Sequence, residues 1–308
     1  MKMKLPLYNS AKYIVAIIIT LILGACGTSN KMKSDVFHFD KQAHRGGRGL
    51  MPENTIAAHK NAIDLNTTLE MDLQMSRDRK IVVSHDPFFN SDFVLTPEGK
   101  TMTKKDGRSR LLFEMNYDSI SKYDVGMKPH PGFPNQKKMH AIKPLLSVLI
   151  DSVERYANEK KHINHYNIEI KSSPNGDGRF YPSLESYVDS ALRIIIDKGI
   201  ASRTMVQSFD VRALQLVHNK YPEIAISFLV SKVNKKDAAA YIQELGFKPE
   251  IFSPDYSLVT KDLVKTFHEL NVRVIPWTPN TVEEIQQLKE MGVDGIITDY
   301  PNLFSEVK

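Results

Sequence analysis

The sequence has a single cysteine among its 308 residues, so no disulfide can form within the chain. It lacks the glycine-rich turns, G-x-G-x-x-G or the P-loop, with which open α/β sheets hold nucleotide phosphates. It also has no run of the ~20 apolar residues that a membrane-spanning helix needs. With 42% hydrophobic and 25% charged residues, the composition excludes a disordered or collagen-like chain and indicates a globular protein with a sizeable core.

A shorter apolar run lies near the N-terminus. The first twelve residues carry three lysines and no acid, and residues 13–23 form an uncharged apolar run of 11 residues, which suits a secretory signal. The stretch Leu23-Gly24-Ala25-Cys26 resembles the lipobox of bacterial lipoproteins, in which the cysteine becomes the lipidated first residue. We therefore expect a signal peptide over residues 1–25 and lipidation at Cys26. The alternatives are a signal peptide cut elsewhere and an uncleaved anchor.

Three of the five excess positive charges come from this N-terminal segment. The whole sequence carries 41 basic and 36 acidic residues, a net charge of +5, of which +2 remains without residues 1–25. We therefore expect no nucleic-acid partner. Residues 26–40 are largely polar and lack periodicity, and we expect them to form a lipidated tether. Such a tether predicts a protein held at a membrane of the bacterial cell envelope, facing the periplasm or the exterior.

From residue 41 onward, short β-branched runs alternate with helical patterns, as in repeated βα units. Strands are predicted at residues 42–45, 68–73, 167–171, 204–208, 225–230, 251–253, 273–277 and 295–298. Helices are predicted at residues 54–65, 145–157, 184–197, 211–219, 236–245, 260–270 and 281–291. Eight strands with helices between them favour an α/β fold of the (β/α)₈ TIM barrel type at residues 41–308, rather than an open doubly wound sheet.

A ninth strand-like run, residues 80–85, follows the second predicted strand closely. The link is too short for a parallel crossover, which takes a dozen or more residues. We therefore predict a hairpin over residues 68–85 with its turn at residues 77–79. An antiparallel return from this turn brings His85 to about the level of Asp72.

The segment at residues 88–143 fits no βα repeat and ends in a proline-rich stretch. We expect it to form a small insertion with one short helix near residues 114–122. Insertions at the carboxyl ends of barrel strands border the active site, so part of the substrate selection is expected here.

The loop after the first predicted strand reads HRGGRGLMPENT over residues 44–55. His44 and Arg45 end the strand, and three glycines allow backbone groups to approach closely. Asn54 is expected to cap the following helix, because a side-chain oxygen there satisfies free backbone amides. Taken alone, a histidine and an arginine followed by glycines are only a weak indication of a catalytic site.

Charged residues alternate with apolar ones in two predicted strands. Glu70 and Asp72 lie two apart, so both side chains point to one face, which we expect to be the inside of the barrel. Glu169 and Lys171 repeat this spacing in the next strand. Three carboxylates that meet at one barrel mouth indicate a site for one divalent cation, Mg²⁺ or Ca²⁺, since both prefer oxygen ligands. The alternative is that these acids pair with lysines and arginines of the barrel.

Two histidines lie at predicted strand ends beside these acids. His44 and His85 are candidates for an acid and a base, because an unperturbed imidazole pKa near 6.5 suits proton transfer at neutral pH. The chain has ten histidines, so their position is what distinguishes these two. Other strands end at Gln207-Ser208-Phe209 and at Trp277, the single tryptophan, which we expect to line a ligand pocket.

Together these motifs resemble the glycerophosphodiester phosphodiesterase family. In chain order they are His44-Arg45-Gly46, Pro52-Glu53-Asn54-Thr55, Glu70-Met71-Asp72, His85-Asp86, Glu169-Ile170-Lys171, Gln207-Ser208-Phe209, Trp277-Thr278 and residues 292–299. They run from about residue 42 to residue 302. Two departures concern loop geometry: Arg79 stands where the family's hairpin usually has glycine, and prolines at positions 276 and 279 flank the Trp-Thr pair.

The resemblance implies metal-dependent hydrolysis of glycerophosphodiesters to sn-glycerol 3-phosphate and an alcohol. The residues that it implies as holders of the divalent cation are Glu70, Asp72 and Glu169. The residues that it implies as the acid and base pair are His44 and His85. It implies substrate binding by Arg45, Lys171, Gln207, Phe209 and Trp277. The two cationic residues would neutralise the phosphodiester, and the two aromatic rings would form an apolar wall against glycerol.

Two other functions also fit the sequence. A lipid-anchored barrel with two histidines also fits a lysophospholipase D or a phospholipase C-like enzyme that acts on membrane lipids. The predicted insertion has no obvious apolar interfacial helix, which weighs against this alternative. A surface binding protein built on an inactive barrel is the remaining alternative, and the intact histidines and acids disfavour it.

Overall fold

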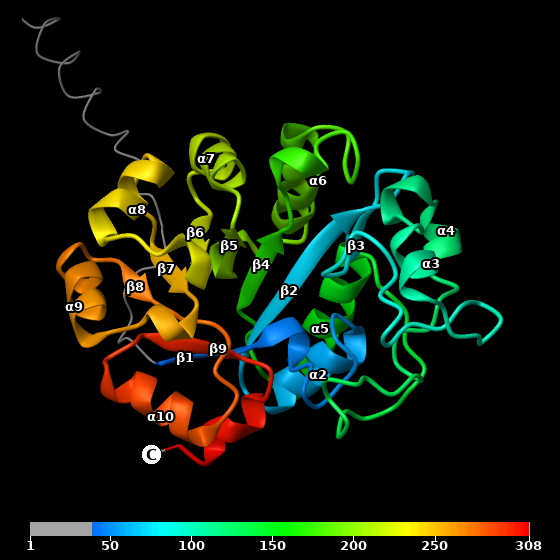
Figure 1. Cartoon of the computed structure of the whole chain (residues 1–308), viewed down its shortest axis with the longest axis horizontal. Coiled ribbons are helices and arrows are strands. Elements are labelled where there is room, and N and C mark those ends of the chain that lie inside the picture. The colour runs from blue at the N-terminus through cyan, green and yellow to red at the C-terminus, as the bar shows by residue number, and fades with distance from the viewer. Residues whose placement is uncertain (1–38, 308) are drawn as a thin grey trace, which may run out of the picture. The chain divides into compact units, whose positions relative to one another are not determined.

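The computed structural model describes residues 39–307, which form a nearly closed barrel of eight parallel strands with helices outside (Figure 1). The strands follow the order β8-β7-β6-β5-β4-β2-β1-β9. This architecture confirms the predicted (β/α)₈ barrel. The predicted signal peptide at residues 1–25, the lipidation site Cys26 and the tether as far as residue 38 lie outside the described residues.

The predicted strands and helices of the barrel are all present, with ends that differ by a few residues. The strands are β1 (Asp40–Ala43), β2 (Thr68–Met75), β3 (Ile81–Val83), β4 (Tyr166–Ile170), β5 (Thr204–Ser208), β6 (Ala225–Val230), β7 (Ile251–Pro254), β8 (Arg273–Val274) and β9 (Gly295–Thr298). The helices are α2 (Ile56–Asp64), α3 (Lys104–Arg108), α4 (Tyr117–Ile120), α5 (Leu146–Lys160), α6 (Leu184–Asp197), α7 (Val211–Lys220), α8 (Ala238–Leu245), α9 (Lys261–Glu269) and α10 (Val282–Glu290).

The strand predicted at residues 273–277 is regular only over β8, its first two residues. Pro276 has no backbone N–H to donate, so the ladder on one side is interrupted there. The chain nevertheless stays extended, and the Ile297 amide of β9 donates to the Pro276 carbonyl at 3.0 Å. This contact and a bridge between Trp277 and Ile297 join the last two strands, so the barrel closes through an irregular segment.

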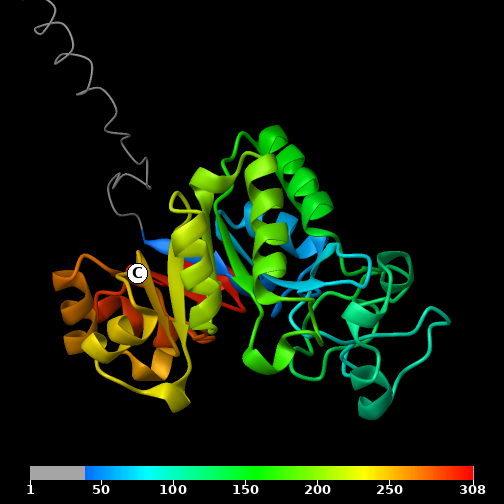
Figure 2. The same cartoon turned by 90° about the horizontal axis from the view of Figure 1, so that it is seen from above.

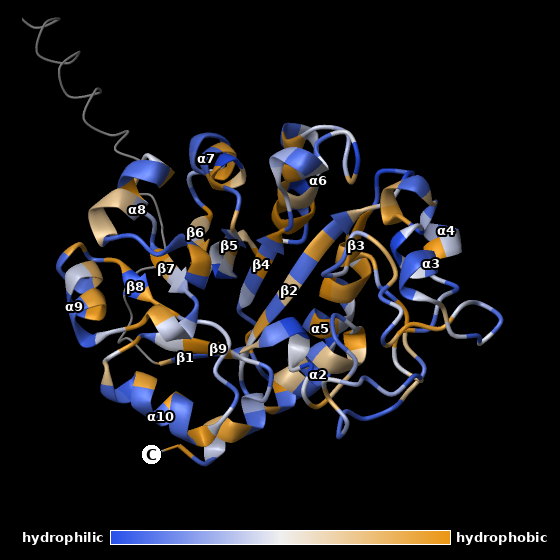
Figure 3. Ribbon diagram, viewed as in Figure 1, coloured by the Kyte–Doolittle hydropathy of each residue, from blue (hydrophilic) through white to orange (hydrophobic). Residues whose placement is uncertain are grey.

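The side chains of β2 show how the barrel separates its two faces. Leu69, Met71 and Leu73 belong to the large core between strands and helices, whereas Glu70 and Asp72 lie on the other face of the strand. Hydrophobic residues are accordingly frequent along the strands, and hydrophobic and hydrophilic residues both occur along the outer helices (Figure 3). The helices α6 and α7 pack side by side on the outside (Figure 2). Within residues 39–307, no helix is both long enough and apolar enough to cross a membrane.

The predicted hairpin is present and pairs β3 antiparallel to β2, with Leu73 opposite Val83. Arg79 takes a left-handed backbone, with a φ of 60°, at the turn where glycine would be less strained. The amide of Ser84 donates to the Asp72 carbonyl at 2.8 Å. Ser84 is therefore level with Asp72, and His85 follows it directly, at about the predicted position.

Between β3 and α5 the chain forms a small layer beside the barrel, which contains α3 and α4 (Figure 1). One short helix was expected near residues 114–122, where α4 lies, whereas α3 was not predicted. This layer has its own hydrophobic cluster, whose buried members are Val82, Phe89, Phe93, Val94, Leu112, Ile120, Tyr123 and Val125. The segment is therefore a packed structure with a defined position against the loops of the barrel.

Candidate active site

Three acidic side chains meet inside the barrel, toward the carboxyl ends of two neighbouring strands. Glu70 and Asp72 come from β2 and Glu169 comes from β4, and the strand register places Asp72 beside Glu169. All three are buried, and the largest exposed fraction among them is 5%, for Glu169. Each offers a carboxylate oxygen within 4.8 Å of the others. The acids predicted from the alternating pattern thus form one group of possible oxygen ligands.

Two cationic side chains lie against this acid cluster. Lys171 Nζ is 3.0 Å from Glu169 Oε1 and 3.6 Å from Asp72 Oδ1. Arg45 Nε is 3.4 Å from Asp72 Oδ2, and the Arg45 amide donates to Glu70 Oε2 at 2.6 Å. The alternative in which the acids pair with barrel cations therefore holds in part. Three carboxylates nevertheless face two cations, so the two cations cannot neutralise all three acids when these are ionised.

Burial and mutual repulsion set the protonation of these acids. Burial, followed by the charge of Asp72, raises the pKa of Glu70 well above its usual range. Burial raises the pKa of Glu169 to about 7, against the effect of Lys171. Burial alone would also raise the pKa of Asp72, but Arg45 and Lys171 hold it well below its usual range. Without a further positive charge, Glu70 is therefore shifted toward its protonated form, and Glu169 is about half protonated near pH 7.

The acid cluster fits a divalent cation. Asp72 Oδ1 is buried and accepts no hydrogen bond, which is costly for a carboxylate oxygen. Carboxylate oxygens are the ligands that Mg²⁺ and Ca²⁺ prefer, and a cation among three acids would keep them ionised. The residues that could hold the ion are thus the three that the sequence indicates.

The loop between β1 and α2 directs Arg45 and Asn54 at the acid cluster. Both have left-handed backbones, with φ values of 52° and 57°. Asn54 Nδ2 donates to Asp72 Oδ2 at 2.8 Å, and the Asp72 amide donates to Asn54 Oδ1 at 3.2 Å. The prediction that Asn54 caps α2 is wrong: the cap is Thr55, whose hydroxyl accepts from the Ala58 amide. The left-handed backbone turns the Asn54 side chain away from α2 and toward β2.

Glu53 fixes the guanidinium group of Arg45. Arg45 NH1 donates to both carboxylate oxygens of Glu53, at 3.1 and 3.2 Å, and both residues are buried. Burial opposes the ionisation of Glu53, but Arg45 and then Arg48 hold its pKa below the usual range. Glu53 lies in the motif Pro52-Glu53-Asn54-Thr55, and the sequence alone assigns it no role. In the structure, the Arg45 side chain is held between Glu53 and Asp72.

His44 is hydrogen-bonded to the carboxylate of Asp299, a residue to which the sequence alone assigns no role. His44 Nδ1 lies 2.6 Å from Asp299 Oδ1, and Asp299 also accepts from Arg48 Nε at 2.7 Å and Asn280 Nδ2 at 2.8 Å. Burial opposes the ionisation of Asp299, but His44 and Arg48 hold its pKa well below the usual range. Burial lowers the pKa of His44 to about 4 in spite of Asp299, so the ring is neutral at pH 7. A neutral ring that donates from Nδ1 presents Nε2 as a proton acceptor.

His85 also has a carboxylate partner, in the next residue. His85 Nδ1 lies 2.8 Å from Asp86 Oδ1, and Asn90 Nδ2 donates to Asp86 Oδ2 at 3.0 Å. Burial would raise the pKa of Asp86, but the hydrogen bond from His85 lowers it to about 2. The His85 side chain is 31% exposed, so solvent and small molecules can reach it. After Arg45 and Lys171, both histidines also contribute to the low pKa of Asp72.

Of the other predicted site residues, Gln207 is buried, whereas Phe209 and Trp277 lie at the rim of the site. Gln207 Nε2 donates to Glu70 Oε1 at 2.8 Å, and Asn167 Nδ2 donates to Gln207 Oε1 at 2.9 Å. Both ends of the Gln207 amide are therefore engaged within the protein, and its contact is with an acid of the cluster. Phe209 is 41% exposed and packs edge-on against Trp277, with 5.4 Å between ring centroids. These two rings form an apolar edge beside the polar site.

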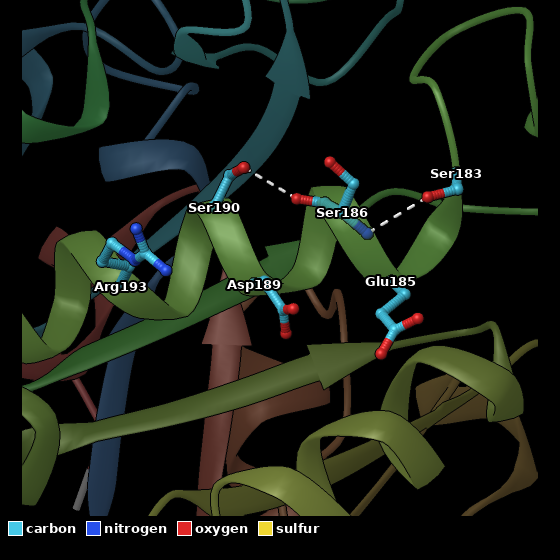
Figure 4. Close-up of a pocket in the computed structure, with 6 residues that line it drawn as sticks. All are labelled: Ser183, Glu185, Ser186, Asp189, Ser190 and Arg193. Atoms are coloured by element: carbon cyan, nitrogen blue, oxygen red, sulfur yellow. Dashed lines mark hydrogen bonds between the residues drawn. The ribbon is translucent and has the colours of Figure 1, made fainter.

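A surface hollow lies elsewhere, along the outer face of α6 (Figure 4). The residues that line it are Ser183, Glu185, Ser186, Asp189, Ser190 and Arg193. Its two acids pair with Lys220 of α7, at 3.0 and 2.6 Å. The hydroxyl of Ser190 donates to the backbone of its own helix, as serine often does inside helices. This hollow is a solvated helix face with internal pairing, and it brings no reactive group to the acid cluster.

A barrel of this kind, with buried acids, flanking cations and two carboxylate-bound histidines toward its carboxyl face, is suited to the hydrolysis of a phosphodiester. The chain belongs to the glycerophosphoryl diester phosphodiesterase family, whose sequence profile it matches over residues 44–303. This match confirms the resemblance seen in the sequence motifs, and with it the enzyme class of the protein.

Several relatives resemble the chain over most of its length. A glycerophosphodiester phosphodiesterase of Bacillus subtilis (strain 168) is 27% identical, covering 86% of this chain and 85% of its own. A human lysophospholipase D is 24% identical, and the match covers 87% of this chain and 85% of the human protein. The crystal structure of a putative glycerophosphoryl diester phosphodiesterase from Silicibacter pomeroyi DSS-3 has 26% identity, covering 88% and 93% of the two chains, with a TM-score of 0.79.

Proposed function

We propose that this enzyme hydrolyses glycerophosphodiesters to sn-glycerol 3-phosphate and an alcohol, using a carboxylate-held divalent cation and a pair of histidines. The observation that carries the proposal is the buried acid cluster, whose oxygens lie within 4.8 Å of one another beside His44 and His85. A phosphodiester is an anion, and its hydrolysis is faster when fixed positive charge absorbs the charge that develops on its oxygens. The excess negative charge of the cluster is what would retain a cation there.

The cation would be held by Glu70, Asp72 and Glu169. When bound, Mg²⁺ or Ca²⁺ supplies Lewis-acid stabilisation of a phosphodiester oxygen. The surrounding residues orient the acids: Gln207 and the Arg45 amide each donate to one oxygen of Glu70. Hydrogen bonds of this kind fix the direction of ligand oxygens and are as important as the ligands themselves.

The phosphodiester group would lie against Arg45 and Lys171, which lie beside the acids and carry fixed positive charge. Glu53 holds Arg45 from behind, so its guanidinium is oriented before substrate binds. His44, neutral at pH 7, would accept or return a proton at Nε2, and His85 would be the second group of the acid and base pair. Asp299 and Asp86 keep the two rings in place through their Nδ1 atoms.

Phe209 and Trp277 would form the apolar wall against the carbon atoms of glycerol. The partly exposed rings lie edge to face, and Lys171 Nζ is 5.9 Å from the centroid of the Phe209 ring. A phosphate neutralised by Lys171 would therefore bring its glycerol carbons next to an aromatic surface. Small polyols gain from such contacts because their C–H faces are less well hydrated than their hydroxyls.

A second candidate substrate is a lysophospholipid. The relatives that are 24% identical to this chain include two human proteins described as lysophospholipase D. The two substrate classes share the phosphodiester and differ in whether an acyl chain remains on glycerol. The exposed edge of Phe209 is where an acyl chain would meet the protein.

The proposal is tested by product release from two substrates. Purified enzyme is incubated with glycerophosphocholine or lysophosphatidylcholine, and sn-glycerol 3-phosphate, lysophosphatidic acid and choline are measured. We expect glycerol 3-phosphate from glycerophosphocholine, loss of activity with chelator, and recovery with added Mg²⁺ or Ca²⁺. Greater turnover of lysophosphatidylcholine would favour the second candidate. Undiminished activity after exhaustive chelation would contradict the metal-assisted mechanism.

We also propose that the enzyme is anchored to a bacterial envelope membrane through a lipid on Cys26. The proposal rests on the resemblance of Leu23-Gly24-Ala25-Cys26 to a lipobox after an apolar run. A Cys26→Ser variant is expected to move from the membrane fraction to the soluble fraction, whereas the wild-type chain stays with membranes until detergent is added. Equal membrane retention of both proteins would contradict lipidation at this residue.

A further inference from the structure

A loop at residues 127–139 of the layer between β3 and α5 lies against the active-site loop after β1. Its ends are tied together, since the Met139 amide donates to the Gly126 carbonyl at 3.1 Å. Gln136 Nε2 donates to the Arg48 carbonyl at 2.7 Å, and the Lys137 amide donates to the Leu50 carbonyl at 2.9 Å. These bonds hold the loop, which we call the strap, directly over the backbone that follows His44 and Arg45.

Aromatic rings connect the strap to the layer between β3 and α5 on one side and to the end of β9 on the other. The ring of His130 stacks on Phe93, a buried residue of the layer's hydrophobic cluster, with centroids 5.1 Å apart. Phe133 lies 4.9 Å from His130 and 6.1 Å from Tyr300, which follows Asp299. The strap thus has an anchor in the packed layer and a contact with the end of β9.

The contact that matters is between Phe133 and Arg48. The Arg48 guanidinium carbon lies 4.9 Å from the centroid of the Phe133 ring, within the range of a cation–π interaction. The same guanidinium donates to both oxygens of Asp299, from Nε at 2.7 Å and from NH2 at 3.2 Å. Asp299 Oδ1 in turn lies 2.6 Å from His44 Nδ1. An unbroken series of contacts therefore runs from the strap to the imidazole of His44.

We propose that Phe133 is a positioning residue: its ring fixes the plane of Arg48, which orients Asp299 and through it His44. Arginine has a long side chain with much rotamer freedom, and its planar group is ordered by stacking on a ring. Arg48 is 23% exposed, so without the ring its guanidinium can leave Asp299 for water. Asp299 would then lose its two hydrogen bonds from Arg48 and keep the one from Asn280 Nδ2, so the Nε2 atom of His44 would be less closely aligned. The proposal rests on the proposed role of His44.

The main test compares Phe133→Leu with Phe133→Tyr. Leucine keeps the apolar volume and removes the π face, whereas tyrosine keeps both. We expect kcat for glycerophosphocholine to fall about tenfold in Phe133→Leu, the change that corresponds to ~1.4 kcal/mol, and to recover in Phe133→Tyr. KM is expected to stay within about twofold, because Arg45 and Lys171 still bind the phosphate. Equal kcat in the leucine variant and wild type would overturn the proposal.

The matched control is Phe113→Leu. Phe113 also lies in the layer between β3 and α5 and also faces a cation, with the Arg79 guanidinium carbon 5.9 Å from its centroid. Its cation is at the hairpin turn and not at His44, so kcat is expected to stay at the wild-type value. A fall in kcat equal to that of Phe133→Leu would show that losing any contact between an aromatic ring and an arginine in this layer lowers activity. It would overturn the specific role of Phe133.

A double-mutant cycle separates positioning from general destabilisation. In an Arg48→Lys background, Phe133→Leu is expected to lower kcat no further, because the group through which the ring acts has already gone. Additive losses in kcat would overturn the proposal, as would a kcat that simply follows the melting temperature of each variant. Wild-type turnover is measured first. If the wild-type enzyme does not hydrolyse glycerophosphocholine, the proposed function is wrong. If it does, and substitution of Phe133 leaves kcat unchanged, only this inference is wrong.

Discussion

A His44→Ala variant is expected to turn over glycerophosphocholine about 10²- to 10⁴-fold more slowly than the wild-type enzyme, the range that a positioned acid or base contributes. Burial keeps the ring neutral at pH 7 and Asp299 holds it through Nδ1, so Nε2 is the atom lost to proton transfer. The measurement is kcat from the release of sn-glycerol 3-phosphate. Wild-type turnover in this variant would refute the assignment of His44.

The fold of this variant is expected to remain intact. Asp299 keeps its hydrogen bonds from Arg48 and Asn280 when the imidazole is removed, so no buried charge is left without a partner. Thermal unfolding is therefore expected near the wild-type temperature. The matched control is His165→Ala, an exposed histidine just before β4, at the opposite end of that strand from Glu169. It is expected to keep both activity and stability.

The barrel was predictable because its strands are short, β-branched and separated by amphipathic helices. The bounds of β5, β6 and β9 agree with the sequence pattern residue for residue. The pattern was least accurate at the end of β8, where an apolar run continues but Pro276 interrupts the ladder. The hairpin was predictable from the length of the link alone, since the six residues between the strands predicted at 68–73 and 80–85 cannot make a parallel crossover.

The acid cluster was also predictable, because alternation with a period of two places Glu70 and Asp72 on one face whatever the partner strands are. The role of Asp299 was not, since it arises from a contact across 255 positions of the chain. Asn54 was misassigned for a related reason. Its residue type suits a helix cap, but its left-handed backbone, which is invisible in the sequence, directs the side chain to Asp72. The strap's contacts belong to the same class of tertiary detail.

A Glu70→Gln variant is expected to lose about three orders of magnitude in activity with only a small loss of stability in chelator. Metal-assisted catalysis is worth several kcal/mol, and each tenfold change in rate corresponds to ~1.4 kcal/mol. Stability behaves differently because burial and Asp72 already raise the pKa of Glu70. Without a cation the wild-type acid is shifted toward its protonated form, and glutamine has nearly the same size. Both forms can accept fully from only one of the two donors, Gln207 Nε2 and the Arg45 amide, because the other oxygen position carries a proton or an NH₂ group.

The decisive measurement is therefore thermal unfolding with and without metal, next to activity. A cation present at ~100 times its dissociation constant stabilises a protein by ~2.7 kcal/mol, so added Mg²⁺ or Ca²⁺ is expected to raise the wild-type melting temperature by several degrees. Glu70→Gln is expected to show little of this rise. The control Glu185→Gln, on the outer face of α6, is expected to keep the full rise and full activity.

Two results would contradict this account. A Glu70→Gln variant that melts well below wild type in chelator would mean that the carboxylate is ionised and paired in the folded protein, as in the alternative where Arg45 and Lys171 neutralise the acids. A variant that keeps the full metal-induced rise would mean that the cation binds elsewhere. If neither occurs, the three buried carboxyl groups are the feature that retains the cation, because a bound cation lets Glu70 and Glu169 ionise beside Asp72.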